Sequence, residues 1–165
     1  QQQIYAKFSS KMLSVCRQYI KDIHHAEDVM ITGFMKVFTN LKNFEHKGSF
    51  EGWIRRIMVY ECIDFLRVKK NNVNHKDIED ITVSENESVY EMEDFSVDDI
   101  QNMIDNLPDG YKMVFNLYAI EGYKHQEIAE MLKISEGTSK SQLSHARKLL
   151  QQQIADLKNK LNGTK

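Results

Sequence analysis

Residues 125–150, HQEIAEMLKISEGTSKSQLSHARKLL, hold two helical patterns that are separated by a short turn. The first pattern covers residues 124–132, and three of its side chains share one face: Ile128, Ala129 and Leu132. The turn at residues 133–135 follows, and we expect it to bury Ile134. The second helix is predicted from about residue 136 to residue 160, with four inward side chains: Leu143, Ala146, Leu149 and Leu150. Two helices joined in this way form a helix-turn-helix.

The outward face of the second helix has a different chemistry. It carries hydroxyl and basic side chains: Lys140, Ser141, Ser144, His145, Arg147 and Lys148. Such groups bind phosphates and base edges, while the apolar face fixes the helix on its support. A plain helical hairpin with a solvated basic face would show the same spacing, so the pattern alone favours DNA binding only modestly over that alternative.

The rest of the chain is also predicted to be helical, because it contains only seven Gly and one Pro. Apolar side chains recur at helical spacing over residues 3–21 and 25–43. Gly48 then breaks the chain, and Ser49 can cap a third helix that runs to about Lys70. We expect this helix to bury six side chains: Phe50, Trp53, Ile54, Ile57, Ile63 and Leu66.

Further capping signals follow in the second half of the chain. Ser96 can cap a helix together with Asp99, three residues on. Pro108 suits the first turn of the next helix, and Gly122 can end it. The sequence therefore predicts an all-α fold.

Charged side chains are unevenly distributed along the 165 residues, although the formal net charge is only -2. Residues 76–110 carry one basic and twelve acidic side chains, whereas the segments on both sides lean basic. Residues 71–95 are acidic, with few apolar side chains, which is typical of a solvated linker. We predict two small helical domains, a three-helix domain over residues 1–70 and a helix-turn-helix domain over residues 96–165, joined by the linker 71–95.

Several classes of protein are disfavoured. Hydrophobic residues make up 41% of the chain, and no apolar run is long enough to insert in a membrane. Cys16 and Cys62 form no CxxC motif, which suits a reducing cytoplasm rather than a disulfide scaffold. No HExxH, P-loop, GxSxG or Rossmann motif is present, so we expect no metal, no cofactor and no enzymatic activity. The chain begins with Gln1 instead of Met, and we expect a trimmed N-terminus.

Two blocks of sequence carry the motifs of one known family. The first consists of five stretches: residues 107–115, 121–123, 126–129, 137–141 and 146–147. The second includes residues 26–44, AEDVMITGFMKVFTNLKNF. Together they resemble the bacterial extracytoplasmic-function (ECF) sigma factors of RNA polymerase, of the Bacteroidetes type. The five stretches resemble region four of that family, and residues 26–44 resemble the helix of region two that binds core polymerase. Six residues fall where the next helix of the family has its aromatic, aliphatic and D-x-x-R positions: Phe50, Trp53, Ile54, Ile57, Asp64 and Arg67.

The resemblance implies a protein that binds core RNA polymerase, directs it to promoter DNA and helps to open the duplex. It places six residues on the polymerase-binding helix: Glu27, Asp28, Thr32, Phe34, Lys36 and Val37. Core packing is an equally good explanation for Phe34 and Val37. Nine residues are expected to contact the -10 element: Phe50, Trp53, Arg55, Arg56, Tyr60, Asp64, Arg67, Lys69 and Lys70. The family often has Asn where Tyr60 stands.

Region four is expected to contact the -35 element as duplex DNA. Its contact set is Lys140, Ser141, Gln142, Ser144, His145, Arg147 and Lys148. The family usually has Val where Ser139 stands and often Arg where Gln142 stands. Gln142 either binds adenine or removes a phosphate anchor. The acidic linker is expected to enter a nucleic-acid channel of the polymerase or to be a plain spacer, and an anti-sigma factor is a possible partner in this family.

Two other hypotheses are open. One is an operator-binding regulator that acts without polymerase, usually as a dimer on paired half-sites. This hypothesis does not explain the block at residues 26–70. The other is an adaptor that docks proteins through both helical domains. Neither would bind core polymerase.

Overall fold

Every regular element in the described residues, 1–72 and 95–162 of a computed structural model, is a helix. The helices fall in two units, unit 1 over Gln1–Asn74 and unit 2 over His75–Lys165. The all-α prediction is therefore confirmed. Most of the predicted linker lies outside the described residues, but its first two, Asn71 and Asn72, form the end of a helix instead.

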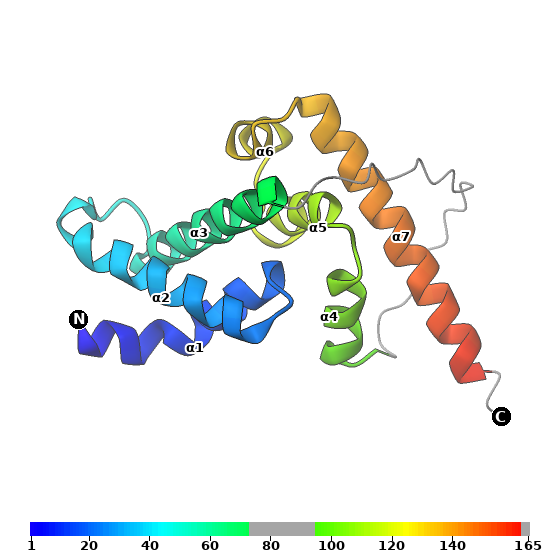
Figure 1. Ribbon diagram of the computed structural model, residues 1–165, viewed down its shortest axis with the longest axis horizontal. Coiled ribbons are helices and arrows are strands. Elements are labelled where there is room, and N and C mark those ends of the chain that lie inside the picture. The colour runs from blue at the N-terminus through cyan, green and yellow to red at the C-terminus, as the bar shows by residue number, and fades with distance from the viewer. Residues whose placement is uncertain (73–94, 163–165) are drawn as a thin grey trace. The chain divides into compact units, whose positions relative to one another are not determined.

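Unit 1 consists of three helices that each contact the other two: α1 (Gln2–Tyr19), α2 (Ile23–Thr39) and α3 (Phe50–Asn72) (Figure 1). The Asp22 carboxylate begins α2 by accepting a hydrogen bond from the His25 backbone N–H at 2.9 Å, which holds the pKa of that carboxyl below its ordinary value. A short 3₁₀ turn, η1 (Leu41–Asn43), follows α2. Ser49 then caps α3 as predicted, since its Oγ accepts from the Gly52 N–H at 3.0 Å.

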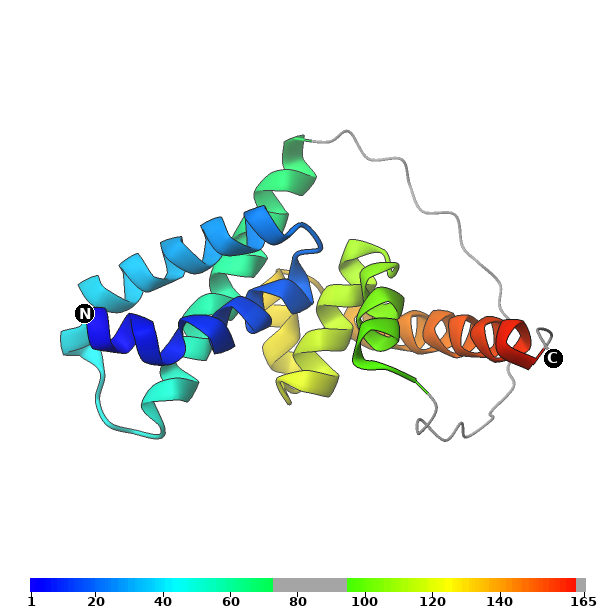
Figure 2. The same ribbon diagram turned by 90° about the horizontal axis from the view of Figure 1, so that it is seen from below.

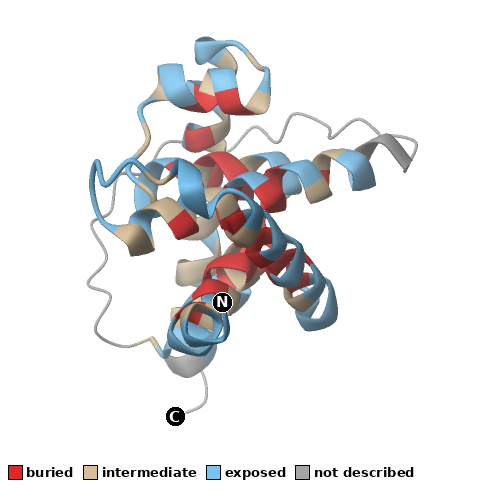
Figure 3. Ribbon diagram, turned by 90° about the vertical axis from the view of Figure 1, so that its left-hand side faces the viewer, coloured by how far each residue is buried: buried red, intermediate tan, exposed pale blue. Residues whose placement is uncertain are grey.

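Residues that are buried lie on the facing sides of these helices, and exposed residues lie on their outer sides (Figure 3). The prediction for α3 was partly wrong. Ile54, Ile63 and Leu66 are buried, but Phe50, Trp53 and Ile57 are only half-buried. The remaining core positions of α3 are occupied by three other side chains: Met58, Val59 and Cys62. Phe50 and Trp53 both pack with Phe44 of the loop before α3, and this keeps them only partly inside the three-helix core.

At Gly33, α2 packs tightly against a side chain of α3. A Cβ atom on this residue would overlap the buried Met58 side chain, whose Cε would be 3.0 Å away. Interiors are packed as tightly as organic crystals, and the Met58 side chain fills the space that the absent side chain of Gly33 leaves.

Unit 2 contains α4 (Val97–Asp105), α5 (Asp109–Phe115), the π-helical turn η2 (Asn116–Ile120), α6 (His125–Leu132) and α7 (Glu136–Asn162). Figure 2 shows the long α7 in orange to red, with the shorter helices of this unit gathered toward its left-hand end. Within the unit, α7 contacts α5 and α6 most extensively and α4 only lightly. A buried ion pair, Lys112 Nζ to Asp105 Oδ1 at 3.5 Å, joins α5 to α4.

The capping signals of unit 2 were largely correct. Ser96 and Asp99 form the predicted capping box, and the Ser96 hydroxyl, followed by its backbone N–H, holds the pKa of Asp99 below its ordinary value. Gly122 ends the α5–η2 helix with a φ of 78°, which glycine adopts readily. Pro108 is the N-cap residue of α5, one position before the first turn. The π-turn η2 was not predicted.

We predict that Gly33→Ala lowers the free energy of unfolding of unit 1 by up to about 2 kcal/mol, because overpacking against the buried Met58 side chain exceeds the roughly 1 kcal/mol that Ala gains over Gly inside a helix. Urea unfolding followed by circular dichroism measures the change. The exposed neighbour Thr32 provides the control, since Thr32→Ala should stay within about 0.5 kcal/mol of the native chain. Equal stability of the two variants would contradict the packing argument.

Candidate nucleic-acid and polymerase interfaces

The helix-turn-helix of unit 2 is fixed by local hydrogen bonds. The Glu127 carboxylate accepts from the Lys124 backbone N–H at 2.8 Å at the start of α6. Lys133 ends that helix in the left-handed conformation, with a φ of 56°. Ser135 Oγ accepts from the Thr138 backbone N–H at 2.9 Å and so begins α7. These bonds set the direction in which α7 leaves the turn.

One stripe of α7 is buried against the rest of unit 2. It consists of Ser139, Leu143 and Ala146, at the i, i+4, i+7 spacing of one helix face. The predicted Leu143 and Ala146 are correct, whereas Leu149 and Leu150 are half-buried. On α6 the buried pair is Ile128 and Met131, while the predicted inward residues Ala129 and Leu132, and Ile134 in the turn, are half-buried. The prediction missed Met131.

The opposite side of α7, which we call the recognition face, carries Lys140, Ser141, Ser144, His145, Arg147 and Lys148. All six side chains are exposed or half-exposed. The seventh member of the predicted set, Gln142, lies elsewhere: its amide nitrogen would be 3.3 Å from a Cβ atom on Gly110 of α5. Gln142 is therefore packed against the support of the helix in this structure.

Two side chains of the recognition face are held within α7 itself. Lys140 forms an ion pair with Glu136 at 2.7 Å, and this hydrogen bond holds the pKa of the Glu136 carboxyl below its ordinary value. Ser141 Oγ donates to the Thr138 carbonyl at 3.1 Å. These two contacts hold the Lys140 and Ser141 side chains in place near the start of α7.

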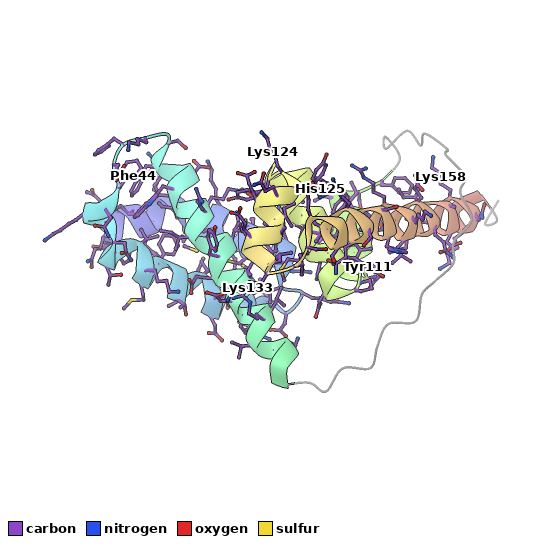
Figure 4. All side chains as sticks on the ribbon, turned by 90° about the horizontal axis from the view of Figure 1, so that it is seen from above. Phe44, Tyr111, Lys124, His125, Lys133 and Lys158 are labelled. Atoms are coloured by element: carbon purple, nitrogen blue, oxygen red, sulfur yellow. The ribbon has the colours of Figure 1, made fainter. Side chains whose placement is uncertain are left out.

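Two aromatic side chains of other elements also contact α7. Tyr111 stacks on His145, with ring centroids 5.5 Å apart and planes at 12°. Tyr118 lies under the Arg147 guanidinium, 5.7 Å from the ring centroid, and stacks on His125 at 4.7 Å. Figure 4 labels Tyr111 and His125, which both lie beside α7. The sequence pattern gave no signal for these contacts, because the partners are far apart along the chain.

Ser139, the departure from the family pattern, has a hydrogen-bond partner. Its side chain is fully buried, and its Oγ is 2.9 Å from Nδ1 of His125. A buried hydroxyl without a partner would cost free energy, and this bond offsets that cost. His125 therefore accounts for a polar residue on the packed side of α7.

In unit 1, the outward side of α2 presents two large apolar side chains that the sequence analysis missed. Ile31 is 50% exposed and Met35 is 61% exposed. Among the predicted polymerase-binding residues, Asp28 and Thr32 are exposed and Glu27 is half-buried. Phe34 and Val37 are buried in the core, which favours the packing explanation for both. The sequence did contain a signal for this apolar pair. Residues 31 and 35 are one helical turn apart, and they lie on a different side of the helix from its buried residues.

A pocket of about 310 Å³ opens between the end of α2, η1 and the middle of α3. Its lining combines aromatic, amide and charged side chains: Lys36, Asn40, Asn43, Trp53, Ile57, Tyr60 and Glu61. Lys36, which is exposed, forms an ion pair with the buried carboxylate of Glu61. Tyr60 is exposed, and Arg56 lies over its ring at 5.9 Å.

Beside this pocket, Phe44 from the loop packs on α3. Its ring centroid lies 5.1 Å from that of Phe50 and 5.4 Å from that of Trp53 (Phe44 is labelled in Figure 4). The remaining predicted -10 residues follow along α3. Arg55 is half-buried, Asp64 forms an ion pair with Arg67 at 3.1 Å, and Lys69 is exposed. The Lys70 side chain lies outside the described residues.

Within residues 1–72 and 95–162, no three His, Cys, Asp or Glu side chains are placed together to hold a metal ion. In the same part of the chain, no helix has both the length and the apolar character of a membrane span.

Known proteins match both units. The family description "Sigma-70 region 2" matches residues 4–72, and "Sigma-70, region 4" matches residues 97–150. The chain belongs to the sigma-70 family. The ECF RNA polymerase sigma factor SigW of Bacillus subtilis is 29% identical, over 91% of this chain and 86% of SigW. The ECF RNA polymerase sigma-E factor of Haemophilus influenzae is 24% identical, over 93% of this chain and 87% of that protein.

A solved structure shares the fold. The sigma factor RpoE of Bartonella quintana, crystallised with the anti-sigma factor NepR, has a TM-score of 0.59 and 18% identity, and the match covers 93% of this chain and 96% of RpoE. The chain is an RNA polymerase sigma factor of the ECF type, as the sequence predicted. Its α6–α7 helix-turn-helix belongs to region four, and α2 and α3 belong to region two.

We predict that Lys36→Met lowers the free energy of unfolding of unit 1 by about 1–3 kcal/mol, since it leaves the buried Glu61 carboxylate without this cation. Chemical denaturation measures the loss. Adding Glu61→Leu should recover most of it, because an apolar pair needs no charge compensation. Full stability of Lys36→Met would show that the pair contributes nothing to the fold.

Proposed function

We propose that the recognition face of α7 binds the -35 promoter element as duplex DNA. The observation that carries the proposal is that α7 has one buried side and one exposed side of different chemistry. One side is buried through Leu143 and Ala146, so the opposite side is held outward as a unit. Arg147 and Lys148 suit phosphate contacts, whereas Ser144 and His145 have the chemistry to reach base edges.

Unit 1 binds the -10 element as a single strand in this proposal. Melted DNA needs a basic surface for the phosphates and aromatic groups for the bases. The pocket beside Trp53 and Tyr60 has the size and the mixed lining that suit an extruded base, with the amides of Asn40 and Asn43 available as hydrogen-bonding groups. Arg55, Arg56 and Lys69 supply positive charge along the same helix.

The outward side of α2 docks on core RNA polymerase. Asp28 and Thr32 remain from the predicted set, and Ile31 and Met35 add an apolar centre between them. An exposed apolar pair with polar neighbours is the pattern of a protein interface core with its rim. Phe34 and Val37 support the helix from inside.

We place the protein in the cytoplasm with core polymerase and promoter DNA as partners, and with no catalytic activity of its own. The acidic linker occupies a basic nucleic-acid channel of the polymerase. An anti-sigma factor is a further partner, supported by the likeness to RpoE, whose structure contains one. The abundance of Lys, Phe and Tyr supports the Bacteroidetes type.

We expect Met35→Glu to weaken binding to core polymerase at least tenfold, because it places a charge in the centre of the docking surface. Fluorescence anisotropy with labelled protein measures the affinity. Ser10→Glu adds the same charge to an exposed position of α1 and should bind like the native chain. Since Met35 is 61% exposed, the fold should tolerate both changes. Native affinity of Met35→Glu would remove α2 from the interface.

For the duplex, we expect the double variant Arg147→Ala/Lys148→Ala to reduce the salt dependence of promoter binding by about two phosphate contacts. The slope of log affinity against log salt measures this for the reconstituted holoenzyme on promoter fragments from its own genome. Lys158→Ala, at the far end of α7, should leave the slope unchanged. A double variant with the native slope would show that these residues do not contact phosphates.

A further inference from the structure

Contacts outside α7 connect two residues of this helix that are two turns apart. Ser139, on its buried side, shares a hydrogen bond with His125 of α6. The His125 ring stacks on Tyr118 of η2, at 4.7 Å and 22°, and Tyr118 lies under the Arg147 guanidinium. The series Ser139–His125–Tyr118–Arg147 thus begins and ends on α7 and passes through α6 and η2.

The π-turn η2 explains the position of Tyr118. Asn116 and Leu117, the first two residues of the turn, are fully buried and fix it to unit 2. Tyr118 is 37% exposed, so its ring lies at the surface, next to the recognition face. π-helical turns inside α-helices occur frequently at functional sites. Here the turn places an aromatic ring under one arginine of that face.

We propose that Tyr118 is a positioning residue for Arg147 in duplex recognition, and that His125 and Ser139 hold the Tyr118 ring in place. This inference rests on the proposed function of the recognition face. An arginine in solution samples many rotamers, and it must give up that freedom when it binds a phosphate. A ring under the planar guanidinium removes much of the freedom beforehand and leaves the N–H donors at its edge available.

Lys148 is a basic residue against which the effect of Tyr118 on Arg147 can be compared. It belongs to the same face and follows Arg147 directly, but the contact with Tyr118 is made by Arg147. If Tyr118 acts through Arg147, its removal should matter only while Arg147 is present. If it acts by supporting the whole helix, its removal should weaken DNA binding whichever basic residue remains.

The test is a pair of double-mutant cycles, measured as affinity of the reconstituted holoenzyme for promoter fragments selected by the native holoenzyme from its own genome. We expect Tyr118→Ala to weaken binding about threefold to tenfold and Arg147→Ala somewhat more. The double variant Tyr118→Ala/Arg147→Ala should bind no worse than Arg147→Ala, whereas the effects of Tyr118→Ala and Lys148→Ala should multiply. Tyr118→Phe keeps the ring and should restore binding to within about twofold.

Other outcomes overturn the inference in distinguishable ways. Multiplying effects of Tyr118→Ala and Arg147→Ala would show that Tyr118 does not act through Arg147, although the proposed function would stand. Native binding by Arg147→Ala would refute both the inference and the proposed contact of Arg147. Thermal unfolding checks each variant, and Tyr118→Leu replaces Tyr118→Ala in the cycles if the alanine variant is not folded. Native binding by a folded Tyr118→Leu would likewise contradict a role for the ring.

Discussion

The burial of one narrow stripe of α7 is the constraint on which unit 2 depends. Ser139 and Ala146 are small and fully buried, so α7 lies close to its supporting helices, and Leu143 fills the space between them. Burial of that side fixes the rotation of α7 about its axis, so the opposite side of the helix must face away from the supporting helices. The recognition face is a consequence of this packing, and the hydrogen bond between Ser139 and His125 makes a polar residue acceptable within the stripe.

The same reasoning explains the two surfaces of unit 1. Gly33 lets α2 approach α3, and the close packing at Met58 fixes the rotation of α2 about its axis. That rotation leaves Ile31 and Met35 on the outside, where apolar side chains gain nothing from the fold of the unit. It also places Lys36 beside Glu61, at the edge of the pocket on α3. The core packing of three helices thus determines both proposed binding surfaces.

Local signals in the sequence predicted the helices and their ends well. Ser49, Ser96 and Gly122 act at the predicted positions because caps and turns depend on neighbours within three or four residues. The prediction of which side of α3 is buried was less accurate, because apolar residues occur on several sides of that helix. Trp53, for example, is only half-buried. The stacking of Tyr118 under Arg147 was beyond prediction, because it joins residues that only the tertiary fold and an unexpected π-turn bring together.

Initiation by the reconstituted polymerase tests the central claim most directly. The measurement is run-off transcription by purified core RNA polymerase on fragments of the protein's own genome, with and without the protein. The account predicts discrete transcripts that depend on the protein and disappear when Arg147 and Lys148 are both changed to alanine. A protein that still shifts duplex DNA, but neither binds core polymerase nor supports any specific transcript, would contradict the account.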